Sequence, residues 1–306
     1  ALDKIQEQLA AIEQSEWKGL VEGLTGSRKA STDENGQVIF NDLPYGLYLI
    51  VQTDVSGAEY EASALGYDIL IKGIRPGESC RDWVCKRNLD GAIFIGNYTD
   101  LISEEMQSLG KQLVLVDCYD KGTQVHSNIG IDDENGGYLA TKYLLENEHK
   151  RIALASSSII VDGPIRRRYL GYKKAMNEAG IADVEDMVFH DALSFDGGYR
   201  IGRPDITAVF AVGDIMAFGI MKAMYTAGKQ IPDDLSIVGF DNTKGCEFSM
   251  PALTSVDQPV YDRGRMAVQA LVSAIRDEKC SLTRRTLPVS LEIRSSVAPL
   301  LAKGGM

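Results

Sequence analysis

The fold class is decided by residues 207–242, TAVFAVGDIMAFGIMKAMYTAGKQIPDDLSIVGFDN. An apolar run at Ala208–Val212 opens this stretch, as is typical of a strand that helices cover on both faces. A helical stretch at Asp214–Ala227 follows, with its first residue as the expected cap and Gly228 as the expected stop. A second apolar run lies at Ser236–Phe240. The order of strand, helix and strand predicts a βαβ unit in a parallel sheet.

The same alternation of apolar runs and helical stretches covers the chain from about residue 66 onward. Further strands are expected at Tyr67–Ile71, Gly91–Ile95, Leu113–Asp117, Arg151–Ala155 and Val188–His190. Further helices are expected at Asp132–Glu148, Pro164–Ala179 and Tyr261–Asp277. We therefore predict an α/β fold with mainly parallel, buried sheets.

The start of the chain follows another pattern. Residues 1–23 form an amphipathic helical stretch, and residues 31–53, STDENGQVIFNDLPYGLYLIVQT, place turn signals around short strands, as in a β-hairpin. Residues 32–53 resemble one hairpin of the Cna-B-type β-sandwich of surface proteins, although Gln52 stands where those domains often have a glutamate. A generic hairpin explains the same residues equally well. We expect an atypical N-terminal helix and hairpin segment at residues 1–44.

Composition excludes several classes of protein. The 306 residues include 43 acidic and 32 basic side chains, so the chain lacks the cationic field that holds a nucleic-acid backbone. No apolar run approaches the ~18 residues of a membrane span, and the first residues lack the order of a secretory signal. We expect a cytoplasmic protein without membrane contact. The five cysteines form no C-x-x-C pair and the three histidines lack metal-ligand spacing, so neither metal nor cofactor is expected.

Catalytic templates are also missing from the sequence. The chain has no G-x-S-x-G elbow, no G-x-x-x-x-G-K-[ST] phosphate loop and no G-x-G-x-x-G after a strand. His149, in the run ENEHKRIA, is expected at the solvent-facing end of a helix rather than as a general base. Helix-start and turn formation explain the acidic runs at residues 132–134 and 233–234. We therefore do not expect an enzyme, and a hydrolase is a minor alternative.

Polar residues follow four of the expected strands. They are Asp117 and Tyr119, Ser156–Ser158, Gly213 and Asp214, and Asp241 and Asn242. Open α/β sheets bind ligands at the carboxyl ends of their strands. These residues predict a cleft for a polar, hydroxyl-rich small molecule, although each of them is also an ordinary turn former.

An ordered series of motifs carries a family resemblance. The motifs are GYDILIKGI, NLDGAIFIG, QLVLVDCY, NIGIDDENGGYLATKYLLENEHKRIALASSS, IRRRYLGYKKAMNEAGI, the stretch quoted first and PALTSVDQPVYDRGRMAVQALV. From about residue 60 to 298 this order resembles the effector-sensing core of the LacI/GalR transcription regulators. The resemblance implies a two-lobed periplasmic-binding-protein-like fold with an effector in a central cleft. The implied N-terminal lobe is 45–152 with 258–288, and the C-terminal lobe is 153–257 with 289–300.

The resemblance also implies effector contacts. Arg168, in R-Y-L-G-Y, matches a family arginine that contacts sugar hydroxyls or a purine, and Asp241, in G-F-D-N, matches an effector-binding aspartate. An exposed helix arginine and a turn aspartate are the alternatives. The other candidate contacts are Asn135, which is equally suited to a helix surface, Gln258, which is equally suited to a hinge, Phe195 and Tyr119.

Several positions depart from the family pattern. Gly213 stands where an asparagine is usual, and Leu193 stands where an aromatic platform is common, with Phe195 close enough to replace it. The family's first strand and helix should precede the motif GYDILI, where the hairpin stands. Either Tyr48–Thr53 is the first strand, with a short crossover after it, or this part of the lobe is remodelled. The helix-turn-helix of the family is missing from the sequence, so this chain is not expected to bind operator DNA alone.

These inferences favour a ligand sensor over a catalyst. A sugar or sugar-like effector would bind between the lobes and favour their closed arrangement, and in a whole regulator a homodimer would transmit this change to DNA. The helix at Asp214–Ala227, rich in Met216, Phe218, Met221 and Met224, is a candidate dimer contact or ordinary core. A solute-binding protein of a sugar transport system is the alternative, and an engineered or surface-displayed fusion is a third.

Overall fold

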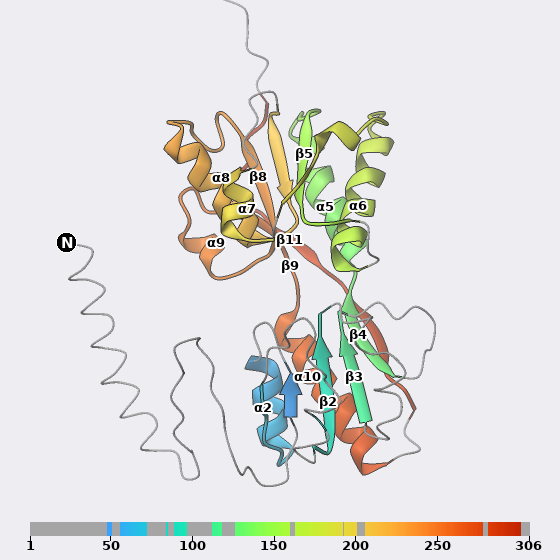
Figure 1. Cartoon of the computed structure of the whole chain (residues 1–306). Coiled ribbons are helices and arrows are strands. Elements are labelled where there is room, and N and C mark those ends of the chain that lie inside the picture. Colours follow the sequence, from blue (N-terminus) through green and yellow to red (C-terminus); the bar gives the residue numbers. More distant parts are fainter. Residues whose placement is uncertain are drawn as a thin grey trace, which may run out of the picture. The chain divides into compact units, whose positions relative to one another are not determined.

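The computed structural model divides the chain into two compact units, Ala1–Pro44 and Tyr45–Met306. The structure describes residues 48–50, 56–71, 84, 89–96, 112–117, 126–159, 163–191, 193–200, 206–277 and 281–300. The expected N-terminal helix and the first strand of the expected hairpin, with its Cna-B-type resemblance, lie outside the described residues. The second unit contains two β-sheets and the chain segments that run between them (Figure 1).

The first sheet has five parallel strands in the order β1-β2-β3-β4-β10. They are β1 (Tyr48–Ile50), β2 (Gly91–Ile95), β3 (Gln112–Val116), β4 (Ser127–Ile131) and β10 (Arg284–Leu287). Helix α10 (Val260–Arg276) packs on β2, β3 and β4, and α2 (Ser56–Ala64) packs on α10. The apolar runs of β2 and β3 are buried as expected, and they form this sheet's core with the apolar face of α10.

The second sheet has the order β11-β9-β8-β7-β5-β6, with only the β11–β9 pair antiparallel. Its strands are β5 (Ile152–Ser156), β6 (Val188–His190), β7 (Ala208–Ala211), β8 (Ser236–Asp241), β9 (Thr254–Asp257) and β11 (Ser290–Glu292). The helices that follow or flank these strands are α5 (Asp133–Glu146), α6 (Pro164–Glu178), the 3-10 turn Glu185–Met187, α7 (Phe195–Arg200), α8 (Asp214–Thr226) and α9 (Gly245–Phe248). A second apolar core encloses this sheet.

The chain passes between the two sheets three times. The crossings run from β4 to α5, from β9 to α10 and from β10 to β11. Helix α5 packs on β8, β9 and β11 of the second sheet, so the first crossing lies just before Asp133. The expected lobe boundary at residue 152 stays a prediction, and this contact favours a boundary near residue 132 instead.

Glycines set how closely α5 and α6 approach one another. A Cβ atom at Gly137 would overlap the backbone carbonyl of Arg168, and one at Gly171 would overlap the backbone carbonyl of Glu134. Any side chain at these two positions would therefore push the helices apart. The close contact places Arg168 of α6 beside the first turn of α5.

The α/β class and the parallel sheets are confirmed, and six of the seven expected strands lie within one residue of their predicted ends. The strand expected at Tyr67–Ile71 is wrong, because those residues have no ladder partner in the part of the chain that the structure describes. The backbone N–H of Tyr67 donates to Ala62 at the end of α2, while Leu70 is buried. Ile71, by contrast, is 44% exposed, so the apolar character of this run predicted neither full burial nor strand pairing. The first strand is β1, which pairs with β2, and α2 lies in the connection between these two strands.

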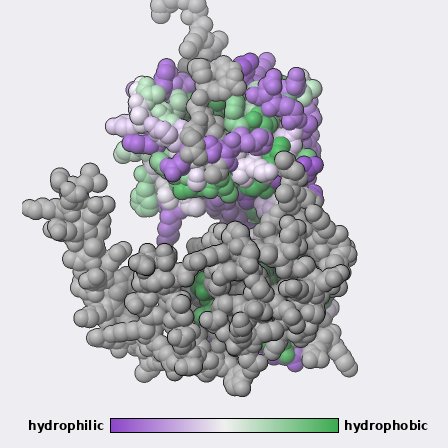
Figure 2. All heavy atoms as spheres, in the orientation of Figure 1, coloured by the Kyte–Doolittle hydropathy of each residue, from purple (hydrophilic) through white to green (hydrophobic). Residues whose placement is uncertain are grey.

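The expected cap of α8 is a second correction. Gly213 is the residue that precedes the helix. Asp214 is the first helical residue, and its side chain is fully buried. Met216 and Met221 of the same helix lie in the core, so the core alternative holds for these two residues. Across the described residues, no helix combines the length and the apolar character that a membrane span requires. Figure 2 shows hydrophilic and hydrophobic side chains interspersed over the described part of one face.

Candidate functional site

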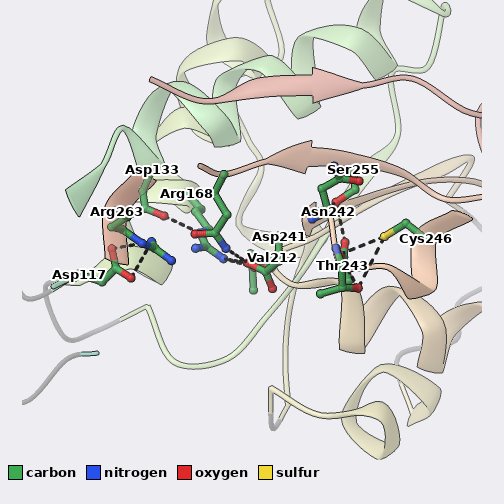
Figure 3. A network of polar contacts seen from close by, with 12 residues as sticks. Asp117, Asp133, Arg168, Val212, Asp241, Asn242, Thr243, Cys246, Ser255 and Arg263 are labelled. Atoms are coloured by element: carbon green, nitrogen blue, oxygen red, sulfur yellow. Dashed lines mark hydrogen bonds and ion pairs between the residues drawn. The ribbon is translucent and has the colours of Figure 1, made fainter. Parts of the chain in front are cut away.

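Arg168 lies at the centre of a buried network of polar contacts at the carboxyl edge of the second sheet (Figure 3). Its Nε atom donates to Oδ1 of Asp133 at 2.7 Å, and its Nη1 atom donates to the carbonyl of Val212 at 2.6 Å. The guanidinium carbon lies 3.5 Å from the centre of the Phe240 ring, which adds a cation–π contact. These contacts fix the plane of the guanidinium group.

Asp241, the last residue of β8, faces this guanidinium. Its Oδ1 atom lies 3.6 Å from Nη1 of Arg168 and accepts a hydrogen bond of 2.7 Å from Nε2 of Gln258. Asp241 adopts a φ of +111°, which turns the chain sharply at the strand end. Burial raises the pKa of Asp241 to about 7; the charge of Arg168 opposes this shift and the charge of Asp214 adds to it. About a third of its side-chain surface is exposed, so a ligand can still reach the carboxyl group.

Two atoms of this pair remain available for a ligand. Among the residues that the structure describes, none forms a hydrogen bond with Nη2 of Arg168 or with Oδ2 of Asp241. The first atom is a donor only, and the ionised carboxylate oxygen is an acceptor only. A hydroxyl group can satisfy both atoms because it both accepts and donates.

A second ion pair lies in the first sheet. Nη1 of Arg263, in α10, contacts both carboxylate oxygens of Asp117 at 2.8 and 2.9 Å. Burial raises the pKa of Asp117 although the charge of Arg263 acts against it, and the charge of Asp133 raises it further. Asp117 follows β3 with a φ of +55°, so this strand also ends in a sharp turn.

Asp214 stabilises the chain that follows Asp241 and does not face the candidate ligand contacts. Its carboxylate accepts hydrogen bonds from the backbone and hydroxyl of Thr243, from Ser255 and from the thiol of Cys246. Burial raises the pKa of Asp214, and these donors act in the opposite direction. Burial also raises the pKa of the Cys246 thiol to about 12, so this cysteine is not a nucleophile at neutral pH.

The structure brings Arg168, Asp241 and Gln258 together, and the other candidates stay predictions. The alternative of an exposed Arg168 is wrong, because this side chain is buried. Asn135 is exposed, and its backbone N–H donates to the capping side chain of Asp132. Phe195 is exposed at the start of α7, and Tyr119 lies outside the described residues.

Asp133 and Arg263 were not predicted as part of the site. Asp133 belongs to a run of acidic residues at a helix start, which the helix dipole already explains, and only the position of α6 shows its partner. Arg263 is separated from Asp117 by well over a hundred residues. A basic residue in an amphipathic helix gives no signal of such a contact.

The expectation for His149 is wrong. The ring is buried, with Nδ1 3.1 Å from the hydroxyl of Thr207 and Nε2 3.0 Å from both the hydroxyl of Ser236 and the carbonyl of Ala298. The helix α5 ends before this residue, and the ring contacts Thr207, just before β7, and Ser236, the first residue of β8. Across the described residues, no group of three or more His, Cys, Asp or Glu side chains is arranged to hold a metal ion.

Sequence comparisons give a consistent group of relatives. The family model described as the periplasmic binding protein-like domain matches residues 141–297. The HTH-type transcriptional repressor PurR of Vibrio atlanticus is 32% identical over 240 residues, which cover 73% of this chain and 70% of that protein. Catabolite control protein A of Priestia megaterium is 31% identical over 219 residues, or 69% of this chain. The match spans 65% of that protein's length.

Solved structures give the same result. A LacI family transcriptional regulator from Enterococcus faecium with bound ribose superimposes with a TM-score of 0.76 and 28% identity, covering 83% of this chain and 99% of that one. The complex of the transcriptional regulator CelR with cellobiose has a TM-score of 0.74 and 26% identity, covering 83% and 86%.

Proposed function

The chain belongs to the LacI family of transcriptional regulators and comprises their ligand-sensing core, and from this premise we propose that it binds a sugar or sugar-like metabolite through Arg168 and Asp241. The relatives described above are regulators and not enzymes, which favours sensing over both catalysis and the transport alternative. Two of the similar structures hold ribose and cellobiose, which are uncharged and rich in hydroxyl groups.

The observation that carries this proposal is the donor–acceptor pair formed by Nη2 of Arg168 and Oδ2 of Asp241. Both groups are held in place by contacts through their other atoms, so little order is lost when a ligand binds. The stacking of Arg168 on Phe240 keeps the free edge of the guanidinium in one plane.

Residues in or directly after two of the three crossing segments contact this pair. Asp133, the first residue after one crossing, holds Arg168, and Gln258, in another crossing, holds Asp241. The affinity of a ligand for the pair should therefore depend on the lobe arrangement, because a change at these crossings moves the residues that hold Arg168 and Asp241. Such differential affinity shifts the population of lobe arrangements, and linkage requires that a bound operator change ligand affinity by the same factor.

We further propose that this core acts as a homodimer in the cytoplasm and reaches DNA through a helix-turn-helix domain. The supporting observation for dimerisation is a set of exposed apolar side chains on α8, α9 and the turn after them. They are Tyr225, Phe248 and Met250, exposed by 76%, 80% and 96%. A contiguous patch of exposed apolar side chains marks a protein–protein contact, and we propose that these residues belong to one.

The proposal is tested by a thermal-shift screen against pentoses, hexoses, their phosphates and nucleobases, followed by titration calorimetry of each hit. We expect at least one hit whose affinity falls about tenfold or more in Asp241→Asn, because the variant amide no longer offers a charged acceptor. Exposed Asp262→Asn, in α10, is the control and should bind as the wild type does. A hit that binds both variants with wild-type affinity contradicts the site.

A further inference from the structure

Asn242 follows the candidate ligand contact Asp241 in an unusual backbone turn. Both residues have positive φ angles, +111° at Asp241 and +50° at Asn242. Asparagine tolerates the left-handed region, whereas an angle of +111° is rare for any residue other than glycine. Such a strained backbone persists only where the surrounding contacts hold it in place. The contacts of Asn242 therefore help to determine how the carboxyl group of Asp241 is oriented.

Two side-chain amides connect the ends of β8 and β9 reciprocally. Nε2 of Gln258 donates to Oδ1 of Asp241 at 2.7 Å, and Nδ2 of Asn242 donates to Oδ1 of Asp257 at 2.7 Å. Asp241 and Asp257 are also partners in the parallel ladder of the two strands. Each strand thus ends in an acid that is followed by an amide, and each amide donates to the acid of the other strand. The two hydrogen bonds close a ring, so each of them favours the geometry that the other requires.

Arg294 fixes the orientation of the Asn242 amide. Its Nη2 atom donates to Oδ1 of Asn242 at 2.7 Å, and its Nη1 atom donates to the carbonyl of Leu253 at 2.8 Å. The backbone N–H of Arg294 also donates to the hydroxyl of Thr254 at 2.9 Å. Because the carbonyl end of the Asn242 amide accepts from this guanidinium, its donor end faces Asp257.

The backbone of Asn242 is held as well. Its N–H group donates to the hydroxyl of Ser255 at 3.1 Å, and that hydroxyl donates to the buried carboxylate of Asp214 at 2.6 Å (Figure 3). Both ends of the Asn242 side chain and its backbone N–H are thus bonded to protein groups. This arrangement suits a residue that orients its neighbour better than one that binds ligand itself.

The partners of the Asn242 amide lie next to two different crossings between the sheets. Arg294 lies two residues after β11, the strand into which the third crossing leads. Asp257 is the last residue of β9, directly before the second crossing. A movement of either crossing therefore changes a contact of Asn242, and the shared turn passes this change to Asp241.

We propose that Asn242, oriented by Arg294, is a positioning residue that holds Asp241 in its ligand-binding orientation and connects the third crossing to the ligand contacts. The inference rests on the proposed function and adds the residues that act on those contacts. Asn242 acts through the turn that it shares with Asp241 and through the ring that includes Gln258. Arg294 acts one step further away, through the amide of Asn242.

The ring is tested by reversing one of its hydrogen bonds. Asn242→Asp keeps the acceptor for Arg294 but places an oxygen where the donor to Asp257 was. Ribose and cellobiose are the probes, titrated by calorimetry at pH 8. A sugar that binds the wild type should bind this variant about tenfold more weakly, the scale of one charge-assisted hydrogen bond. Adding Asp257→Asn returns a donor in the reverse direction and should restore the affinity to within about threefold of the wild type.

A second readout needs no ligand. Because Gln258 donates to Asp241, whose pKa is about 7, the side-chain amide signals of Gln258 in NMR spectra should move between pH 6 and pH 8 in the wild type. Gln258→Leu identifies these signals by their loss. In Asn242→Asp they should move by no more than about half as much, since the turn no longer holds Asp241 against Gln258, and adding Asp257→Asn should restore the movement.

The matched control is Asn147→Asp, at the end of α5. The Nδ2 atom of Asn147 donates to the carbonyl of Tyr143 at 2.8 Å, so the same change removes a comparable donor. This variant should lose stability in urea unfolding while sugar affinity and the Gln258 signals stay at their wild-type values. A merely structural role of Asn242 predicts the same result for Asn242→Asp.

Arg294 is tested with two variants. Arg294→Ala removes the donors to Asn242 and Leu253 and should weaken sugar binding about tenfold, while Arg294→Lys keeps the charge but offers one ammonium group for both carbonyls and should recover only part of the affinity. Arg276→Ala is the control, because Arg276 also donates to a backbone carbonyl, that of Leu65, and its loss should leave affinity unchanged.

The outcomes separate this inference from the proposed function. Full movement of the Gln258 signals in Asn242→Asp overturns the inference and leaves the sensing role intact. Unchanged affinity of that variant for a sugar that binds the wild type also overturns it. If neither sugar binds the wild type, these two sugars are not the effector, whereas the Gln258 signals still decide whether Asn242 positions Asp241.

Discussion

Gln258 donates a hydrogen bond of 2.7 Å from its Nε2 atom to Oδ1 of Asp241. Gln258 lies in the crossing between β9 and α10, while Asp241 ends the central strand β8. The bond therefore connects the candidate ligand contact to a segment that joins the two sheets. A change in the charge or position of Asp241 is felt directly at this crossing.

Replacing Gln258 with leucine should lower the free energy of unfolding on the order of 1 kcal/mol, because a largely enclosed carboxylate loses a donor. The loss should be larger at pH 8, where Asp241 is charged, than at pH 5, where it is protonated. Urea unfolding at the two pH values measures this difference. Gln269→Leu is the control for the loss of an amide donor, because it removes a bond of the same length from Gln269 in α10 to Glu61 in α2.

Arg168 is predicted to be structural as well as a ligand contact. Arg168→Ala leaves the buried Asp133 without its guanidinium and should destabilise the protein by about 3–5 kcal/mol. Arg168→Lys keeps the charge but loses the planar set of donors, so it should cost less stability while still weakening ligand binding. Chemical unfolding and calorimetry together separate the two effects.

The neighbouring Arg167 provides the control for this experiment. Its contact with Glu134 is 4.0 Å long and exposed, so the loss of this contact alone should change stability by no more than about 0.5 kcal/mol. An Arg168→Ala variant as stable as Arg167→Ala would show that the buried pair with Asp133 does not stabilise the fold.

The sequence predicted the regular elements better than it predicted the polar network. Near-continuous apolar runs such as Gly91–Ile95 specify buried strands by composition alone, and the structure places β2 at these residues. The strands β9 (Thr-Ser-Val-Asp) and β11 (Ser-Leu-Glu) were missed because neither contains a run of apolar residues. The strand expected at Tyr67–Ile71 failed for another reason: only Leu70 of this run is buried, and strand pairing depends on a neighbouring strand edge that an apolar run does not reveal.

Single-residue roles at the strand ends depended on distant partners. Arg168 and Asp241 were identified through a family resemblance, and the local sequence left an exposed arginine open as the alternative. What buries Arg168 is the glycine contact between α5 and α6, which aligns it with Asp133. Asp214 was expected to cap its own helix, and it instead accepts hydrogen bonds from residues after β8 and in β9. Local sequence shows a polar residue near a helix start but does not show which side chains surround it.

The raised pKa of Asp241 predicts a pH-dependent stability. Its pKa is about 7 in the folded protein and ~4 in the unfolded chain, so the folded state binds the proton more tightly. The free energy of unfolding should therefore fall as the pH rises from about 4 to 7. Asp241→Asn removes this decline and should be more stable than the wild type at pH 8. Parallel pH profiles for the two proteins, measured by urea unfolding, would contradict the raised pKa.

The proposed dimer makes a separate prediction. Phe248→Glu combined with Met250→Glu places charge on the exposed face of α9 and the following turn, and it should convert a dimer to a monomer. Sedimentation equilibrium measures the mass directly. Leu282→Glu, at an exposed position before β10, should leave the mass unchanged. A monomeric wild type would exclude the dimer, and a dimeric double variant would place its interface on another face.

His149 should contribute stability that is lost at mildly acidic pH. Burial lowers its pKa below the ordinary value of about 6.5, and the carbonyl of Ala298 opposes this shift. A histidine with a lowered pKa in the folded state stabilises the protein above the unfolded pKa, and this contribution is lost as the pH falls below about 6.5. His149→Gln should therefore be less stable at pH 8, by roughly 2 kcal/mol for the lost hydrogen bonds, and its stability should fall less between pH 7 and 5.

The titration of Asp241 changes the free energy of unfolding in the opposite direction over the same pH range. The effect of His149→Gln should therefore be measured in a protein that also carries Asp241→Asn. In that background the parent should lose stability from pH 7 to pH 5, and adding His149→Gln should flatten the profile, as followed by urea unfolding. His190→Gln is the matched control, because His190 is exposed and its Nδ1 atom has only the carbonyl of Ser157 as a partner. If the profile stays equally steep with His149→Gln and with His190→Gln, the neutral buried form of His149 does not govern stability, and the acid sensitivity belongs to other groups.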